Sequence, residues 1–498
     1  VASDATLFSH AGQGHQLKLN KASATDTASL LFQSNWSGRA ELGLAGSDDF
    51  ALKVSADGSA FGAWRTLLRE AGWTSEQLYT VSYESLTNEV SVRDIAEGFD
   101  KLLRQRVGLA NDEPFDVMVH SAGMLVLRAW LTRRGMTAQR RARVKHVIAL
   151  APATFGSPLA HKGRSFLGAL VKGRKQLGPD FLEAGDQVLD ALELGSRFGW
   201  DLSHTDLFGT ECFYDSKRTT PYVFVFCGAR GYRGMSAQAN SPGTDGAVRW
   251  AGCALNSRKV VLDLTADCAD DARVQALDWT QDDVPMYPVA NVDHGSILSA
   301  PPPALQQMVI DALRVSSRPS YAAWCERADT MVRSTREAMV PWQQFIVRAV
   351  DERGDGIRDW NLQLGLRDGA MLEPFTQDVH VYSGDASYRS FHVNLSQLKN
   401  SAVLRGRPRR LTAQLYASTG TQRVLYTSAM VDTTGVGVAV AAPNRAGTWH
   451  GSLDLSSVLP GGAVRFFHPF TTTFIEVRLD REPLTGPGMV VRLHEPDQ

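Results

Sequence analysis

The sequence predicts an α/β protein built on a mostly parallel sheet, with a small β-rich segment before it and an antiparallel β-sandwich after it. Two observations predict this fold class. From about residue 61 to 315, strand-like and helix-like segments alternate, as they do where helices join parallel strands. From about residue 342, apolar residues recur with a period of two between turns rich in Gly, Asp, Ser and Pro.

A chain of 498 residues is too long for a single hydrophobic core, and it predicts about three structural units. A core of residues 61–315 is expected to carry a helical lid or cap at about 160–215. The predicted division of the chain is a β-rich segment at 1–60, the α/β core at 61–315, a helical linker at 316–341 and the β-sandwich at 342–498. If the units are independent, a chain that ends near residue 340 should remain soluble.

The individual elements follow from short patterns along the chain. The first segment holds three runs of β-strand character, at Ala28–Gln33, Arg39–Leu44 and Phe50–Val54. Within the α/β core, the sequence patterns predict helices at 63–72 (AWRTLLREAG), 91–108 and 123–135. They predict strands at 78–83 (LYTVSY), 115–121 (FDVMVHS), 144–153 (VKHVIALAPA) and 221–229 (PYVFVFCGA). Within the β-sandwich, the period-two pattern predicts strands around QFIVRAVD, WNLQLGLRDG, FHVNLSQL, LTAQLYAS, WHGSLDL and TFIEVRLDREP. Phe345, Leu364 and Val393 are predicted to lie in its core.

Composition and charge exclude several functional classes. The chain is 43% hydrophobic and 21% charged, with a net charge of −1, so it offers no basic face for nucleic acid. Apolar runs are too short for a transmembrane helix, which needs about 18 residues or more. Five cysteines without CxxC spacing argue against a disulfide framework and a zinc site. The first residues lack the pattern of a signal peptide, and a cytoplasmic and a secreted location both stay open.

The strongest chemical motif lies where the strand FDVMVHS runs through Ser121 directly into a helix. A sharp strand–turn–helix junction lifts a serine hydroxyl off the edge of a sheet, where it can act as a nucleophile. The next backbone N–H, that of Ala122, is then a candidate donor to an oxyanion, and the start of the helix favours negative charge there. The alternative is that Ser121 only caps the helix that begins near Gly123. Val119 stands where the pattern G-x-S-x-G has its first glycine, which implies an altered turn or reduced activity.

A serine hydroxyl needs a base and an orienting acid, and candidates for both follow Ser121 in the order that this fold uses. Asp245 lies in SPGTDGAV, in a glycine-rich loop after the strand PYVFVFCGA. His294 lies in NVDHGSIL, ahead of a helical run, and loops that follow parallel strands meet at one edge of a sheet. Singly, Asp-Gly is a common turn and a loop histidine is usually solvated. The adjacent Asp293 is the weaker candidate acid, because sequence neighbours rarely orient one another.

Four segments resemble those of bacterial lipases and of the related lecithin–cholesterol acyltransferase-like branch of the α/β-hydrolase superfamily. They are VHSAGMLVLRAWL, ALAPATFGSPLA, SPGTDGAV and VDHGSIL, within a resemblance that covers residues 61–300. The resemblance implies an acyl-ester or lipid substrate and a triad of Ser121, Asp245 and His294. It also implies a lid after Pro158, for which the helical apolar spacing of 165–199 is suited. The alternative is that these helices simply pack on the sheet.

The resemblance breaks at the second oxyanion donor. Lipases carry a His-Gly pair after the first core strand, whereas this chain has Asp57-Gly58, which leaves the N–H groups of Ser59 or Ala60 as candidates. The preceding stretch, GHQLKLNKASATDTASLLFQSNWSGRAELGLAGSDDFALKVSADGSAF, resembles a small β module of phage and gene-transfer-agent tail proteins. Either the last strand of this module doubles as the oxyanion strand, or the fusion removed the usual strand.

No cofactor or metal is predicted. The chain contains neither a P-loop nor an HExxH motif. Asp282 and Asp283 are the candidate pair for a calcium ion that steadies the histidine loop, although such pairs are more often solvated.

Two functions therefore compete. The first is a lipase or esterase that works through an acyl-enzyme. The second is a degenerate hydrolase fold that serves as a binding or structural protein, in which the N-terminal module and the sandwich attach to a particle, a surface or another protein. The order of the triad favours the first function, whereas Val119 and the missing His-Gly pair favour the second.

Overall fold

In the computed structural model, the chain divides into two compact units, Val1–Arg69 with Trp73–Ser82, and Glu70–Gly72 with Tyr83–Gln498. The described residues are 19–23, 27–34, 37–45, 50–54, 61–81, 83, 89–105, 113–161, 185–214, 220–233, 237, 239–268, 272–277, 283–366, 371–400, 411–428, 438–441, 448–455, 466–485 and 490–491.

The first unit contains a three-stranded antiparallel sheet in the order β1-β2-β3. Its strands, β1 (Thr27–Ser34), β2 (Ser37–Ala45) and β3 (Phe50–Val54), confirm the three predicted runs. Among the described strands β3 pairs with β2 only, so the structure gives it no place in the parallel sheet. Helix α1 (Gly62–Glu70) follows.

The strand predicted at LYTVSY is wrong for its described residues, which form no strand at 78–81. Tyr79 is 64% exposed and Val81 is 41% exposed. Alternating polar and apolar residues suit a strand with one buried face, but a strand forms only where a neighbouring strand pairs with it.

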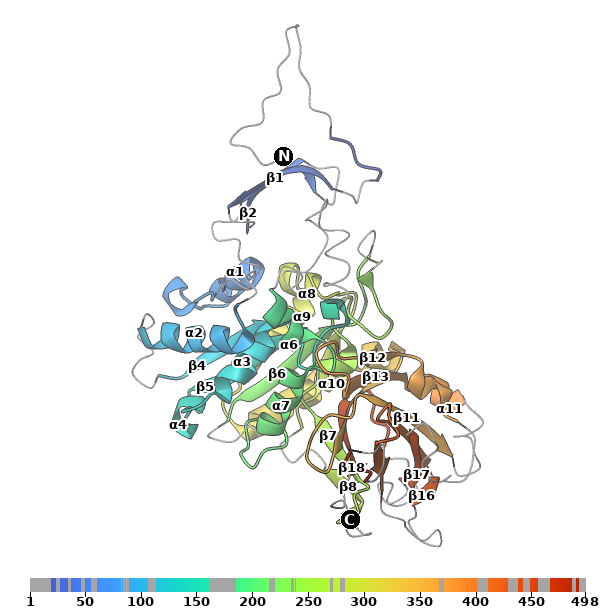
Figure 1. The fold of residues 1–498 in the computed structure, drawn as a ribbon. Helices are drawn as coiled ribbons and strands as arrows, with labels where there is room; N and C mark the ends of the chain where they lie inside the picture. The colour runs from blue at the N-terminus through green and yellow to red at the C-terminus, as the bar shows by residue number, and fades with distance from the viewer. Residues whose placement is uncertain are drawn as a thin grey trace, which may run out of the picture. The chain divides into compact units, whose positions relative to one another are not determined.

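The centre of the second unit is a four-stranded parallel sheet in the order β4-β5-β6-β9. Figure 1 shows β4, β5 and β6 of this sheet. Its strands are β4 (Phe115–His120), β5 (Val144–Leu150), β6 (Tyr222–Gly228) and β9 (Met286–Val289). Strands β5 and β6 are almost wholly buried. Their near-continuous apolar sequences are typical of parallel strands that helices cover on both faces.

Helices surround this sheet. They are α2 (Val92–Gln105), α3 (Gly123–Leu131), α4 (Ala138–Arg141), α6 (Asp186–Leu192), α7 (Arg197–Asp206), α8 (Ser296–Ser299), α9 (Pro303–Ala312) and α10 (Arg318–Ala338). The predicted linker is α10, and it packs on the sheet. Trp324 meets Phe224 edge to face with 4.5 Å between ring centroids, and the Tyr321 hydroxyl donates to the Val223 carbonyl.

The described part of the predicted lid is packed into the core. In α6 and α7, Leu192, Trp200 and Leu202 are buried in the same apolar cluster as α3. A buried ion pair fastens α7 to α3, since Arg128 Nε donates to Asp206 Oδ2 over 2.8 Å and Arg128 Nη2 donates to Asp206 Oδ1 over 2.9 Å. Residues 162–184 of the predicted lid lie outside the described residues.

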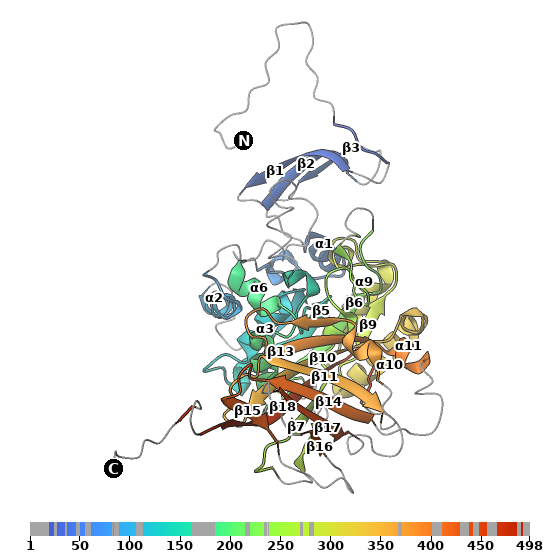
Figure 2. The ribbon, with the colours of Figure 1, turned by 45° about the vertical axis from the view of Figure 1, so that its right-hand side comes forward.

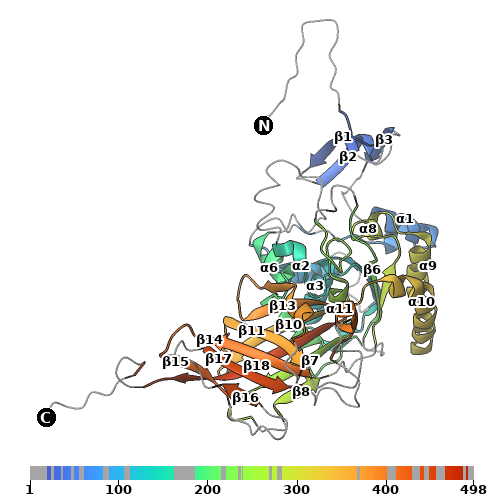
Figure 3. The same cartoon turned by 90° about the vertical axis from the view of Figure 1, so that its right-hand side faces the viewer.

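The C-terminal part forms the predicted sandwich, and its two sheets lie face to face in Figures 2 and 3. Its strands are β10 (Trp342–Asp351), β11 (Asp359–Leu366), β12 (Val379–Val381), β13 (Tyr388–Asn394), β14 (Leu411–Ser418), β15 (Val424–Thr427), β16 (Val438–Ala441), β17 (Thr448–Asp454) and β18 (Thr472–Pro483), with helix α11 (Leu395–Asn400) after β13. Phe345, Leu364 and Val393 are buried in the core between the sheets, as predicted.

The strand pairing differs from the predicted division at one point. Strands β7 (Ser257–Asp263) and β8 (Val274–Leu277) come from the range assigned to the α/β core, yet they complete the sandwich sheet β12-β13-β10-β18-β7-β8. Strand β18 lies parallel to both β7 and β10, so this sheet is mixed rather than purely antiparallel. Ile346, Tyr388 and Phe474 of the sandwich also belong to the apolar cluster of the α/β core. A chain that ends near residue 340 would keep β8 beside β7 but would lose β18 from its other edge, so the expectation that it stays soluble remains a prediction to be tested.

Among the helices of the described residues, none combines the length and the apolar character that crossing a bilayer requires.

Candidate active site

Ser121 occupies the turn between β4 and α3 and has a left-handed backbone, with φ of +52°. A non-glycine residue in this region is strained, and such strain persists only where the surroundings enforce it. Here the Ser121 N–H donates to the Leu150 carbonyl over 3.2 Å, and the Ser121 carbonyl accepts from the Ala153 N–H over 3.0 Å. The turn thus has the geometry of a nucleophile elbow.

The elbow forms with Val119 in place of glycine. Val119 is buried, and a Cβ added to Gly123 would lie 3.5 Å from the Cβ of Val119, which is ordinary contact. Val119 therefore leaves room beside Gly123, and the effect of the missing glycine on the turn and on activity stays a prediction.

The turn presents a hydroxyl, that of Ser121, and a backbone N–H, that of Ala122, which are the candidate nucleophile and the candidate oxyanion donor. Ser121 is buried, and its Oγ makes no hydrogen bond within the described part of the chain. Ala122 is the N-cap residue that directly precedes α3, and its N–H has no acceptor among the described residues. A buried hydroxyl without a partner costs free energy, and such orphaned groups are typical of catalytic sites.

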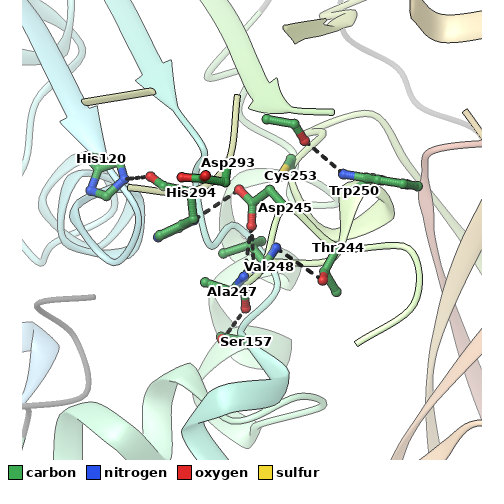
Figure 4. A network of polar contacts seen from close by, with 12 residues as sticks. His120, Ser157, Thr244, Asp245, Ala247, Val248, Trp250, Cys253, Asp293 and His294 are labelled. Carbon is green, nitrogen blue, oxygen red and sulfur yellow. Dashed lines mark hydrogen bonds and ion pairs between the residues drawn. The ribbon is translucent and has the colours of Figure 1, made fainter. Parts of the chain in front are cut away.

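Asp245 and His294 are brought together, both fully buried, although they lie 49 positions apart in the chain. The His294 Nδ1 and the Asp245 Oδ2 are 3.0 Å apart, and the His294 N–H donates to the Asp245 carbonyl over 2.9 Å (Figure 4). The other carboxylate oxygen, Asp245 Oδ1, accepts from the N–H groups of Ala247 and Val248. These contacts fix the carboxylate, and through it the tautomer and orientation of the imidazole.

The loop that follows β9 and carries His294, here called the histidine loop, lies against the end of β6. At Gly228 an added Cβ would lie 2.6 Å from the Val292 carbonyl oxygen, so only glycine permits this approach. The Gly228 carbonyl accepts from Trp250 Nε1 over 2.9 Å, which joins this strand end to the segment after Asp245. Sequence reasoning missed Gly228, although a glycine that ends a buried strand often marks a close backbone approach.

His120 is a second residue that the sequence did not single out. Its ring lies 4.7 Å from the ring of His294 between centroids, and its Nε2 donates to the His294 carbonyl over 2.9 Å. Burial, together with the neighbouring His294, lowers the pKa of His120 to about 3, so its imidazole is neutral at physiological pH. His120 directly precedes Ser121 and therefore links the nucleophile turn to the histidine loop.

The remaining candidates have other roles or fall outside the description. Asp293 caps α8, since its Oδ1 accepts from the Ser296 N–H over 2.9 Å. Asp283 accepts a hydrogen bond from Asn256. Asp282, Asp57, Gly58 and the proposed oxyanion donors Ser59 and Ala60 lie outside the described residues.

The sequence matches no protein-family model and no curated protein. The fold, however, is similar to that of phospholipase PlaB from Legionella pneumophila, with a TM-score of 0.66 and 21% identity over 85% of this chain and 91% of that chain. The same phospholipase in complex with thio-NAD aligns with a TM-score of 0.65 at 21% identity, with the same coverage of both chains. Lipase BlEst2 from Bacillus licheniformis, in its mature form, aligns over 44% of this chain and 74% of its own, at 15% identity and with a TM-score of 0.29. This chain therefore shares with phospholipase PlaB a fold in which an α/β core with a parallel sheet is continued by a β-sandwich.

Proposed function

We propose that this protein is a serine hydrolase that cleaves carboxylic esters of lipids through an acyl-enzyme, with Ser121 as nucleophile, His294 as base and Asp245 as the orienting acid. The observation that carries the proposal is the Asp245–His294 hydrogen bond of 3.0 Å, in a loop that contacts the neighbour of Ser121. The strained φ of Ser121 and its buried hydroxyl support the nucleophile role.

In this mechanism the Ser121 Oγ attacks the ester carbonyl carbon as His294 Nε2 removes the hydroxyl proton. The tetrahedral intermediate collapses, the alcohol leaves with that proton, and the acyl group stays on Ser121. Water then attacks the acyl-enzyme with His294 again as base, which releases the carboxylic acid and restores the serine. Asp245 stabilises the imidazolium that forms in both steps.

The intermediate carries a negative oxygen, and its donors must face it before the reaction begins. The N–H of Ala122 suits the first donor position, because Ala122 is the N-cap residue of α3 and its N–H makes no hydrogen bond among the described residues. Ser59 or Ala60 is proposed for the second. Loss of one such donor typically lowers kcat by about 100- to 1000-fold.

A lipid ester is the proposed substrate class because the fold is shared with a phospholipase over most of both chains. The test measures hydrolysis of p-nitrophenyl butyrate and of phosphatidylcholine vesicles by the wild-type protein and by Ser121→Ala. Ser299→Ala is the matched control, since it removes an exposed hydroxyl at the end of α8.

We expect turnover of both substrates by the wild type and by Ser299→Ala, and background rates for Ser121→Ala. Turnover that survives in Ser121→Ala would contradict the nucleophile. If the folded wild type hydrolyses neither substrate, the degenerate binding protein is the better account.

A further inference from the structure

Three potential metal ligands from distant parts of the sequence meet on the second unit. They are His161, which follows β5 by a short helical turn, Glu193 at the end of α6, and His380 in β12. Their ligand atoms all lie within 4.8 Å of one another. The Asp245–His294 pair does not include any of them.

The separations suit a single small cation. His380 Nε2 is 2.9 Å from Glu193 Oε1, and His161 Nδ1 is 3.7 Å from the same oxygen. In a tetrahedral zinc site, with metal–ligand bonds of about 2.1 Å, neighbouring ligand atoms lie about 3.4 Å apart. The two observed distances bracket that value, and the ligand atoms of the two histidines lie within 4.8 Å of each other.

The carboxylate is held in position by groups other than the two histidines. Ser383 donates its N–H to Glu193 Oε1 over 2.8 Å and its hydroxyl to Glu193 Oε2 over 2.5 Å. Oε1 therefore lies near both imidazoles and also accepts from the Ser383 N–H, while Oε2 accepts from the Ser383 hydroxyl. Ligating carboxylates are commonly fixed by such hydrogen bonds from a second layer of residues.

The burial of the cluster also suits a metal ligand. Glu193 is 1% exposed, and a carboxylate that is removed from water is stabilised by coordination to a cation. Each imidazole offers a ring nitrogen as a further ligand.

We propose that His161, Glu193 and His380 bind a zinc ion that fastens the edge strand β12 of the sandwich to the end of α6. Two imidazoles and one carboxylate are a ligand set that zinc uses in proteins, with water in the fourth position. The His161 side chain is 53% exposed, so an ion can reach the cluster from solvent on that side. Direct contacts already cross this junction, such as the hydrogen bond from the Tyr382 hydroxyl to Asp190. The ion therefore reinforces an existing contact.

The test uses the full-length chain without a polyhistidine tag, stripped of metal by a chelator and then dialysed. Zn²⁺ is titrated calorimetrically, and Co²⁺ is titrated by the visible absorption that a tetrahedral site produces. The variant is His161→Ala, because an exposed side chain can be removed at little cost to folding. The control is His450→Ala, which removes an imidazole from β17 of the sandwich.

We expect one ion per chain, and an affinity for Zn²⁺ that falls at least tenfold in His161→Ala and is unchanged in His450→Ala. Zinc should raise the melting temperature of the wild type and of His450→Ala but not that of His161→Ala, because only a bound ion stabilises the folded state. The absence of stoichiometric binding, or binding that is equal in both variants, would show a hydrogen-bonded cluster without a metal. Neither readout depends on ester hydrolysis.

Discussion

At the scale of residues, the contact between Asp245 and His294 could be predicted because it depends on local context. Ser121 follows a strand and precedes a helix, and Asp245 and His294 follow later strands, so the topology of a parallel sheet directs all three to one edge. The contacts of His120 and Gly228 could not be predicted in this way. They depend on how closely the histidine loop approaches β4 and β6, which appears only when the sheet has formed.

Two aspartates lie next to His294: Asp245, which contacts its imidazole, and Asp293, which precedes it in the chain. Asp245→Asn removes the carboxylate that orients His294 and should lower kcat strongly, and His294→Ala should lower it further because it removes the base itself. Asp293→Asn should leave kcat within about threefold of wild type, since Asp293 caps α8 and does not hold the imidazole. Steady-state kinetics on p-nitrophenyl butyrate would measure this. A larger loss in Asp293→Asn than in Asp245→Asn would reverse the assignment.

The buried His392 predicts loss of stability in acid. Its ring stacks on Trp342, and burial, together with the nearby Arg249, lowers its pKa from 6.5 to about 4, although the hydrogen bond with Asp378 opposes the shift. Between these two pH values the unfolded chain binds a proton that the folded chain does not bind. The free energy of unfolding therefore decreases as the pH falls from 6.5 to 4, and this residue contributes a decrease of about 1.4 kcal/mol per pH unit.

His392→Gln removes the titrating group, so the pH dependence of its stability should be shallower by that amount. Urea unfolding at several pH values between 4 and 6.5 would measure both slopes. Equal slopes in the variant and the wild type would show that His392 is protonated in the folded protein.

At the scale of elements, the strands of the sandwich were predictable but their pairing was not. The run LTAQLYAS is strand β14 over its whole predicted length, since its apolar residues alternate with polar ones. By contrast, β18 runs parallel to β7, a strand more than 200 residues earlier, and periodicity carries no information on such partners. The same limit explains LYTVSY, in which the alternation is present but the partner strand is absent from the described residues.

The junction of β6 with the histidine loop gives a prediction at this scale. In Gly228→Ala the new Cβ would meet the Val292 carbonyl at 2.6 Å and push away the loop that carries His294. We expect a loss of about 1–3 kcal/mol in unfolding free energy, as for other overpacked sites, and a fall in kcat of about tenfold or more.

Gly98→Ala in α2 is the matched control, because an added Cβ there meets nothing within 4 Å. It should keep kcat and should raise stability by up to about 1 kcal/mol, since alanine favours a helix over glycine. Equal kcat in Gly228→Ala and Gly98→Ala would contradict the proposed role of the close approach.

At the scale of the whole molecule, the second unit is one body in which the sandwich completes the α/β core. Phe474 of β18 packs edge to face on Phe155, with 5.5 Å between ring centroids, and Arg249 Nη1 donates to the Ser390 hydroxyl of β13. Composition and periodicity distinguish the alternating strand–helix pattern from the period-two pattern, and the predicted boundary lies where one gives way to the other. Packing across that boundary could not be predicted from either pattern alone.

A chain cut after residue 340 should therefore aggregate, because it would expose the edge of β7 and the apolar surface that β10 and β18 cover. Light scattering of the purified fragment beside the full-length chain would test this. A monomeric fragment that keeps ester turnover would mean that the core folds without the sandwich.

The central claim, that Ser121 is an activated nucleophile, is tested most directly by labelling with a fluorophosphonate, which reacts with a serine only when a base activates it. Intact mass should show one probe per chain, and peptide mapping should place it on Ser121. The label should disappear in Ser121→Ala and form more slowly in Asp245→Asn, because the imidazole then loses its orienting carboxylate. No label on the folded wild type, or a label on another serine, would contradict the claim.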